Sequence, residues 1–245
     1  MYLNPHGPHV QGVTRKLVAR CFSALPPRWR TKPSKKELTL LIHQTSTSRD
    51  ILEIIKAHKD RLDSIHAITC LWKLGKLKGK AAEVSDVRAV VSLVDAHLKQ
   101  DRIATRGLSN ILVALTYIND ALQKSPASQR QGSREPVFKL ARRAASLLRS
   151  QAEDANAHDI ANAAWAAARL WAQDKAQAAA GRPPGSASGG GSVRPRDAEL
   201  LRGSAALLLR RLAPVARQRL KAGYPGITYP LVARALRPCL ELQLH

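Results

Sequence analysis

The sequence predicts an all-α protein, an α-solenoid of about four irregular helix-turn-helix repeats. Apolar residues recur at helical spacing along almost the whole chain, and only a few short Val or Ile clusters would serve as strands. Amphipathic helices alternate with helices that are apolar on nearly all sides, and such helices must be covered by neighbours. The apolar helices also resemble one another, which is typical of repeat architectures.

The first 36 residues are basic and contain neither Asp nor Glu. Transit peptides have this composition, and Val13, Leu17 and Cys21 share one face of a possible presequence helix. We therefore predict that residues 1–36 are a transit peptide for a mitochondrion or chloroplast. The alternative is a disordered basic tail that contacts RNA. Without the eight cations of this segment, +14 of the net charge of +22 would remain.

Residues 37–175 are predicted to form the helical repeats, each beginning with an amphipathic first helix. Ser85 is the expected N-cap of one first helix, and Pro136 is expected to start another. Apolar residues follow the i, i+3, i+4 pattern over residues 51–62, 87–98 and 137–151.

The second helices of the pairs align with one another without gaps. They read AITCLWKLGKL at residues 67–77, LSNILVALTYI at 108–118 and IANAAWAAARL at 160–170. The alignment makes Trp72, Val113 and Trp165 equivalent, at separations of 41 and 52 residues. These separations lie within or just beyond the period of two-helix repeats. We predict that this column, together with Asn110 and Asn162, belongs to the repeat core.

The remaining segments are predicted to be insertions and a fourth repeat. Residues 123–133 are expected to be a mobile loop, and residues 176–196 a flexible Gly/Pro/Ser linker. Residues 197–245 are predicted to form a degenerate C-terminal helical repeat. Val232 would stand in its tryptophan column, and Pro230 would disturb the first turn of its second helix.

The charge of the chain predicts its partner. A net charge of +22, from 40 Lys+Arg and 18 Asp+Glu, favours a polyanion. Nucleic acid is the usual partner of such a domain, and an anionic membrane surface and an acidic protein are the alternatives. No stretch approaches the roughly 18 apolar residues of a membrane span, so no transmembrane segment is expected. Aromatic residues make up only 4% of the chain, which predicts mostly electrostatic and polar contacts.

Basic side chains off the apolar stripes of the first helices are the candidate RNA contacts. A solenoid exposes one helix of each pair along a continuous face, and phosphates need cations spaced along such a face. The alternative is a uniformly dispersed positive surface. The candidates are Lys56, Lys59, Arg88, Lys99, Lys139, Arg142, Arg143, Arg149, Arg202, Arg210 and Arg211.

The tryptophans and asparagines of the second helices have a structural and a functional interpretation. Trp72 and Trp165 lie in apolar helices, which favours packing between repeats over stacking on bases. Asn110 and Asn162 could read a base edge, but a hydrogen bond to a neighbouring backbone group is the favoured role.

Neither an enzyme, a cofactor nor a metal site is predicted. The motif GKLKGKA at residues 75–81 lacks the spacing and the Ser/Thr of a phosphate loop and is expected to be a helix C-cap. The histidines show no H-E-x-x-H spacing and the carboxylates are scattered. Cys21, Cys70 and Cys239 form no C-x-x-C pair, and Cys70 is expected to be a buried apolar residue. Distant residues could still converge into a hidden site.

A recurring pattern in the second helices carries a family resemblance. Residues 159–170, DIANAAWAAARL, follow the pattern D-I-A-N-x-x-W-A-x-A-R/K-L. Residues 66–77 keep the tryptophan and the final basic residue and leucine but lack the asparagine. Residues 107–118 keep the asparagine, but Val113 replaces the tryptophan and Tyr117 the basic residue. This pattern resembles the octotricopeptide repeat, an organellar RNA-binding helical repeat abundant in green algae.

The resemblance covers residues 48–175 well and residues 196–240 poorly. It implies an organellar RNA-binding protein that acts in RNA maturation, processing, stability or translation. Related helical-repeat proteins also occur on mitochondrial ribosomes, so a structural rRNA-binding subunit of a mitochondrial or plastid ribosome is the alternative. A protein-interaction scaffold without RNA is the third possibility. Many family members have far more repeats, so a short member or a fragment is expected.

Overall fold

The computed structural model describes residues 33–77, 84–100, 102–124 and 127–180, and the helical residues 208, 210–215, 217, 218 and 221. Within these residues the regular secondary structure is helical, without a strand. The prediction of an all-α protein is therefore confirmed. The longer helices are α2 (Lys35–Gln44), α3 (Ser48–His58), α4 (Ser64–Lys76), α5 (Val84–Gln100), α6 (Thr105–Gln123), α7 (Ala127–Ser150) and α8 (Ala157–Ala180).

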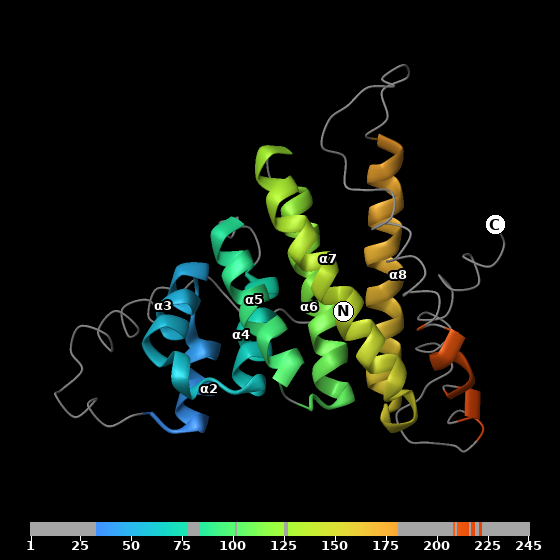
Figure 1. The fold of residues 1–245 in the computed structure, drawn as a ribbon, viewed down its shortest axis with the longest axis horizontal. Coiled ribbons are helices and arrows are strands. Elements are labelled where there is room, and N and C mark those ends of the chain that lie inside the picture. Colours follow the sequence, from blue (N-terminus) through green and yellow to red (C-terminus); the bar gives the residue numbers. More distant parts are fainter. Residues whose placement is uncertain are drawn as a thin grey trace, which may run out of the picture.

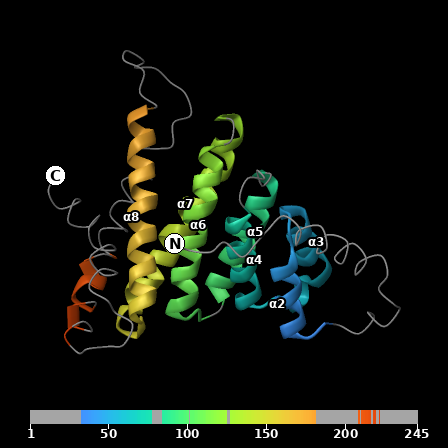
Figure 2. The same ribbon diagram turned by 180° about the vertical axis from the view of Figure 1, so that it is seen from behind.

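The helices lie in two rows along the long axis of the molecule (Figure 1). The even row consists of α2, α4, α6 and α8, each packed on the next, and the odd row consists of α3, α5 and α7. The rows are joined because α4 packs on α5 and α6 packs on α7. The view from behind shows the same order of helices (Figure 2). Each helix thus packs mainly on helices one or two positions away in the chain.

Side-chain caps set where α2, α3 and α4 begin. Ser34, Thr47 and Asp63 each accept a hydrogen bond from the backbone of the third helical residue, whose own side chain reaches back to the cap. Each cap of this kind stabilises a helix by about 1 kcal/mol. The first cap makes α2 begin at Lys35, so the last two residues of the predicted basic tail are helical.

Buried polar side chains connect the starts of neighbouring even-row helices. His66 on α4 is 1% exposed, and its Nε2 lies 2.9 Å from the carbonyl oxygen of Lys35 at the start of α2. Asp159 on α8 is equally buried and accepts a 3.0 Å hydrogen bond from the hydroxyl of Thr105 at the start of α6. His66 and Asp159 both directly precede an aligned second-helix segment, so the two contacts are equivalent in the repeat alignment.

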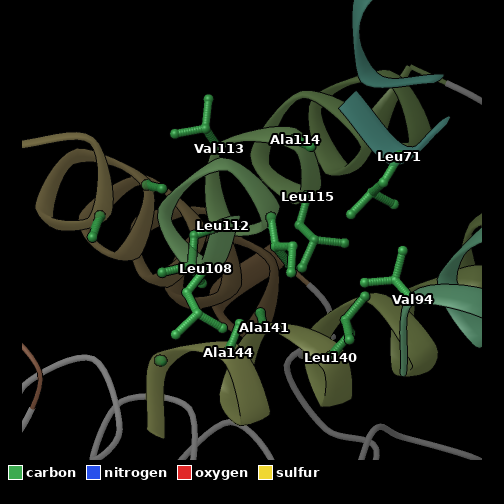
Figure 3. Close-up of a cluster of buried hydrophobic side chains, with 14 of the residues drawn as sticks. Leu71, Val94, Leu108, Leu112, Val113, Ala114, Leu115, Leu140, Ala141 and Ala144 are labelled. Atoms are coloured by element: carbon green, nitrogen blue, oxygen red, sulfur yellow. The ribbon is translucent and has the colours of Figure 1, made fainter. Parts of the chain in front are cut away.

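Helix α6 lies in the middle of the hydrophobic core. Leu108, Leu112 and Leu115 are at most 1% exposed and belong to one cluster with Leu71 of α4 and Leu140 of α7 (Figure 3). Burial of a leucine contributes about 1.5–3 kcal/mol, and α4, α7 and α8 together cover this helix. The sequence expectation that the apolar second helices are covered by neighbours is met for α6.

The apolar stripes predicted for the first helices face the core. Their edges, which include Ile55, Leu147 and Gln151, are half-buried. The buried members are Ile51 and Ile54 of α3, Val87, Val90, Val91, Val94 and Leu98 of α5, and Val137, Leu140, Ala141, Ala144 and Leu148 of α7.

The prediction that Pro136 starts a helix is wrong. Helix α7 begins at Ala127 and continues through Pro136, so residues 127–133 of the predicted loop are helical. Pro136 has no N–H to donate to the carbonyl four residues earlier, and the helix passes it with one backbone hydrogen bond fewer. The guanidinium of Arg134 lies 4.9 Å from the ring of Phe138, a contact across the proline that helical spacing permits.

The C-terminal part of the chain is described only in short pieces. Leu208, Leu212 and Val215 are buried and belong to the main hydrophobic cluster. Helix α8 continues to Ala180, so residues 176–180 of the predicted linker are helical. The rest of that linker and Val232 lie outside the described residues.

Candidate nucleic-acid interface

Most of the predicted RNA-contacting cations lie on the surface of the odd row or of the C-terminal helical segment. Arg142 and Arg143 on α7 are half-buried, and Arg202 lies outside the described residues. The exposed members are Lys56, Lys59, Arg88, Lys99, Lys139, Arg149, Arg210 and Arg211.

Several of these cations are paired with acidic side chains. Asp95 on α5 accepts from Arg143 at 2.5 Å and pairs with Lys99 at 2.8 Å. Partial burial raises the pKa of Asp95, but Lys99 and Arg143 outweigh this effect and hold that pKa below its ordinary value. Two further pairs, Lys56 with Glu53 at 3.4 Å and Arg211 with Glu153 at 2.9 Å, lie on the surface.

Other candidate cations carry no such pair. Lys59, at the end of α3, and Lys139 and Arg149, on α7, are exposed and have no ion pair within the described part of the chain. These three side chains fit the predicted role of phosphate contacts better than Arg143 does, because Arg143 already pairs with Asp95 between α7 and α5.

The even row carries a line of three aromatic rings, which we call the aromatic row. The rings of Trp72 on α4 and Tyr117 on α6 meet edge to face with centroids 6.3 Å apart, and Tyr117 and Trp165 on α8 have centroids 5.9 Å apart. The sequence alignment places Val113 between the two tryptophans, but Val113 is buried at 4% exposure. Tyr117, one turn further along α6, stands there instead, and the sequence analysis did not identify it as a site residue.

The tryptophans have an intermediate position between core and surface. Trp72, Tyr117 and Trp165 are half-buried and pack against the main hydrophobic cluster. The packing that was favoured for Trp72 and Trp165 is therefore present, but both residues remain partly exposed. Edge-to-face contacts between aromatic rings typically contribute about 0.5–1.5 kcal/mol beyond their buried area.

Two cations lie over the aromatic row. The ammonium of Lys76 is 4.5 Å from the ring centroid of Tyr117 and 5.0 Å from that of Trp72. The guanidinium of Arg169 is 5.9 Å from the centroid of Trp165 and pairs with Asp120 at 2.9 Å. Lys76 is exposed and has no ion pair within the described residues.

The asparagines of the second helices are half-buried beside the aromatic row. The amide nitrogen of Asn162 lies 3.0 Å from Nε2 of His158 one turn earlier on α8. This contact is with a side chain, whereas the sequence favoured a neighbouring backbone group. Asn110 is half-buried on α6, seven residues before Tyr117 and therefore on the same helical face.

The glycine-containing motif at residues 75–81 contains the end of α4, as predicted. The helix ends at Lys76, and the backbone N–H of Leu77 donates to the carbonyl of Leu74. Residues 78–83 lie outside the described part. A Cβ on Gly75 would lie 2.9 Å from the carbonyl oxygen of Ala114, so this glycine serves the close packing of α4 on α6.

Cys70 is a buried apolar residue, as expected. Its side chain is fully buried within α4, and burial raises the pKa of its thiol to about 12. Among the described residues no group of three or more His, Cys, Asp or Glu side chains is placed to hold a metal ion. In that same part of the chain, no helix has the length and apolar character needed to cross a bilayer.

A scan against protein-family models gives no match for this chain, and searches of curated proteins and of solved structures find no similar chain. The resemblance to the octotricopeptide repeat therefore rests on the aligned second helices of this sequence.

Proposed function

We propose that this protein is an α-solenoid that binds RNA in a mitochondrion or chloroplast and acts in RNA maturation, stability or translation. The observation that carries the proposal is the stacking of helix pairs along one axis with unpaired cations at intervals. Lys59 and Lys76 come from the pair α3–α4, Lys139 and Arg149 come from the pair α7–α8, and all four are exposed without an ion pair in the described part. Such a surface favours binding of an RNA backbone, because each contact between a cation and a phosphate releases a condensed counterion.

The overall charge supports a polyanionic partner independently of any single contact. If all 18 acidic residues were paired with cations of the chain, 22 of the 40 Lys and Arg residues would still have no acidic partner. This excess favours association with a polymer of high negative charge density. The protein is proposed to act by binding, since the sequence contains no recognisable catalytic motif.

The organellar location is proposed from the acid-free basic segment 1–36 and from the family resemblance of the second helices. Fractionation of cells that express the tagged full chain tests this part. Enrichment in mitochondria or plastids supports it, and a uniformly cytosolic or nuclear signal contradicts it.

The test of RNA binding is ultraviolet crosslinking of the tagged protein in cells, followed by sequencing of the bound RNA. A few sharp peaks on organellar transcripts are expected. Peaks confined to ribosomal RNA, with co-sedimentation that survives high salt, would instead indicate a ribosomal subunit. RNA at the level of an untagged control would contradict RNA binding and favour a protein-interaction scaffold.

A further inference from the structure

The aromatic row concentrates a scarce residue type on one surface. The chain has ten Trp, Tyr and Phe residues, and three of them lie in line across α4, α6 and α8. Trp72, Tyr117 and Trp165 each pack against the main hydrophobic cluster and remain partly accessible. Packing alone explains the buried parts of these side chains, whereas their accessible parts lie on three successive helices of the even row.

The cations of the aromatic row differ in how far they are neutralised. Arg169 shares its charge with Asp120, 2.9 Å away. Lys76 has no ion pair in the described part, and its ammonium is held against the rings of Trp72 and Tyr117 at 5.0 and 4.5 Å. The ring contacts restrict where this ammonium lies and do not neutralise it. The α4–α6 end of the row therefore presents a positioned positive charge beside aromatic rings.

Aromatic rings beside an unneutralised cation are suited to single-stranded nucleic acid. Bases stack on aromatic side chains whatever their identity, and the cation contacts the phosphate backbone. A duplex offers phosphates but keeps its base faces stacked inside, so it would use only the cation. Binding of an acidic protein would likewise leave the ring edges without a specific role.

We infer that single-stranded RNA binds across the even row, with a backbone phosphate at Lys76 and bases against the accessible parts of Trp72, Tyr117 and Trp165. This inference rests on the proposed RNA binding. It places the contact on the second helices of the pairs, whereas the sequence favoured the first helices. Asn162 is half-buried and lies one turn before Trp165 on α8. Its amide would contact the edge of a base that stacks on Trp165.

The experiment measures binding of the full chain to a fluorescent oligouridine and to an abasic strand of equal length, by anisotropy over a range of salt concentrations. Tyr117→Leu removes one ring of the row, and Tyr117→Phe keeps it. Lys76→Gln removes the positioned charge, and Arg49→Gln removes an exposed charge on α3 of the odd row that has no ion pair within the described residues. Circular dichroism melting checks that each variant is folded.

We expect Tyr117→Leu to weaken oligouridine binding about tenfold, within the range for loss of one stacked base, and to leave binding to the abasic strand unchanged. Tyr117→Phe should bind like the wild type. Lys76→Gln should reduce the slope of log affinity against log salt by about 0.7 on both strands, the value for one phosphate contact in single-stranded RNA. Arg49→Gln should leave that slope unchanged.

Failure of the wild type to bind oligouridine would remove the proposed RNA binding and this inference together. If the wild type binds oligouridine and both Lys76→Gln and Tyr117→Leu bind it equally well, the inference is overturned. The proposed RNA binding is then unaffected. Equal effects of Lys76→Gln and Arg49→Gln would indicate a dispersed positive surface and also overturn the inference. If Tyr117→Leu does not fold, the salt slope of Lys76→Gln, an exposed substitution, decides the question.

Discussion

Gly75 allows α4 to lie directly against the backbone of α6. A Cβ at this position would lie 2.9 Å from the carbonyl oxygen of Ala114 and 3.3 Å from the Cβ of Tyr117. The absent side chain thereby lets Lys76 reach across to the ring of Tyr117. One glycine on α4 thus contributes both to the core and to the geometry of the aromatic row.

We expect Gly75→Ala to lower the free energy of unfolding by about 1–3 kcal/mol, because the new methyl group meets backbone that cannot rotate away. Alanine has the better helix propensity, by about 1 kcal/mol, which acts in the opposite direction. Gly107→Ala is the comparison, since its methyl group would meet side chains and not backbone, at 2.7 Å from Cγ2 of Ile103 and 3.1 Å from Cδ1 of Ile68. Urea unfolding followed by circular dichroism measures both. A Gly75→Ala variant as stable as the wild type would contradict the close-packing argument.

At the scale of the elements, Asp95 links two helices of the odd row. It lies on α5 and pairs with Lys99 of the same helix and with Arg143 of α7. The exposed pair of Lys56 with Glu53 lies within α3 and joins no two elements. Charge reversal at Arg143 would therefore disturb the packing of α5 on α7, and a loss of RNA binding in that variant would be ambiguous.

We predict that Asp95→Asn lowers the free energy of unfolding by about 1 kcal/mol at pH 7, at the upper end for partly exposed ion pairs. The folded-state pKa of Asp95 is lowered from 3.8, so its contribution is fully present above that pH and is lost as the pH falls below it. In urea titrations at a series of pH values, the difference in the free energy of unfolding between wild type and variant should narrow as the pH falls below 3.8. Glu53→Gln, the control, should cost less than about 0.5 kcal/mol. A constant difference down to acidic pH would show that the charge is not responsible.

The whole molecule is a stack in which the helices differ in how well they are covered. Helix α6 packs on α4, α7 and α8, whereas α2, at one end of the even row, packs mainly on α4 and to a lesser extent on α3 (Figure 1). In a molecule built from neighbouring contacts, local stability follows the number of packed faces. The ends of such a stack open more readily than its middle.

Hydrogen exchange tests this gradient. We expect amides of α6 to exchange only through global unfolding and amides of α2 to exchange through local opening of lower free energy. Mass spectrometry of peptides from α2, α4 and α6 over a urea series measures the two regimes. Equal protection of α2 and α6 would indicate that the whole stack opens as one unit.

How much of this was predictable from the sequence depends on the range of the interactions. The helical stripes of α3, α5 and α7 follow from a repeat of 3.6 residues, which is a local property, and they were predicted correctly. The start of α7 was predicted wrongly. Pro136 is a strong local signal for a helix start, and the helical residues before it were assigned to a loop. The cations were identified as a class, but which of them are neutralised by acids on other helices was not.

The sequence by itself determined the all-α fold, the excess of positive charge and the recurrence of the second helices, since these depend on composition and local spacing. Only the tertiary structure decided that Tyr117 and not Val113 stands between the tryptophans. It also decided that Asp95 pairs with Arg143, while Lys76 has no ion pair within the described residues. These contacts join residues roughly 45 or more positions apart. Their partners are set by how each helix is rotated and shifted against the next, and that register comes from the packing of whole surfaces.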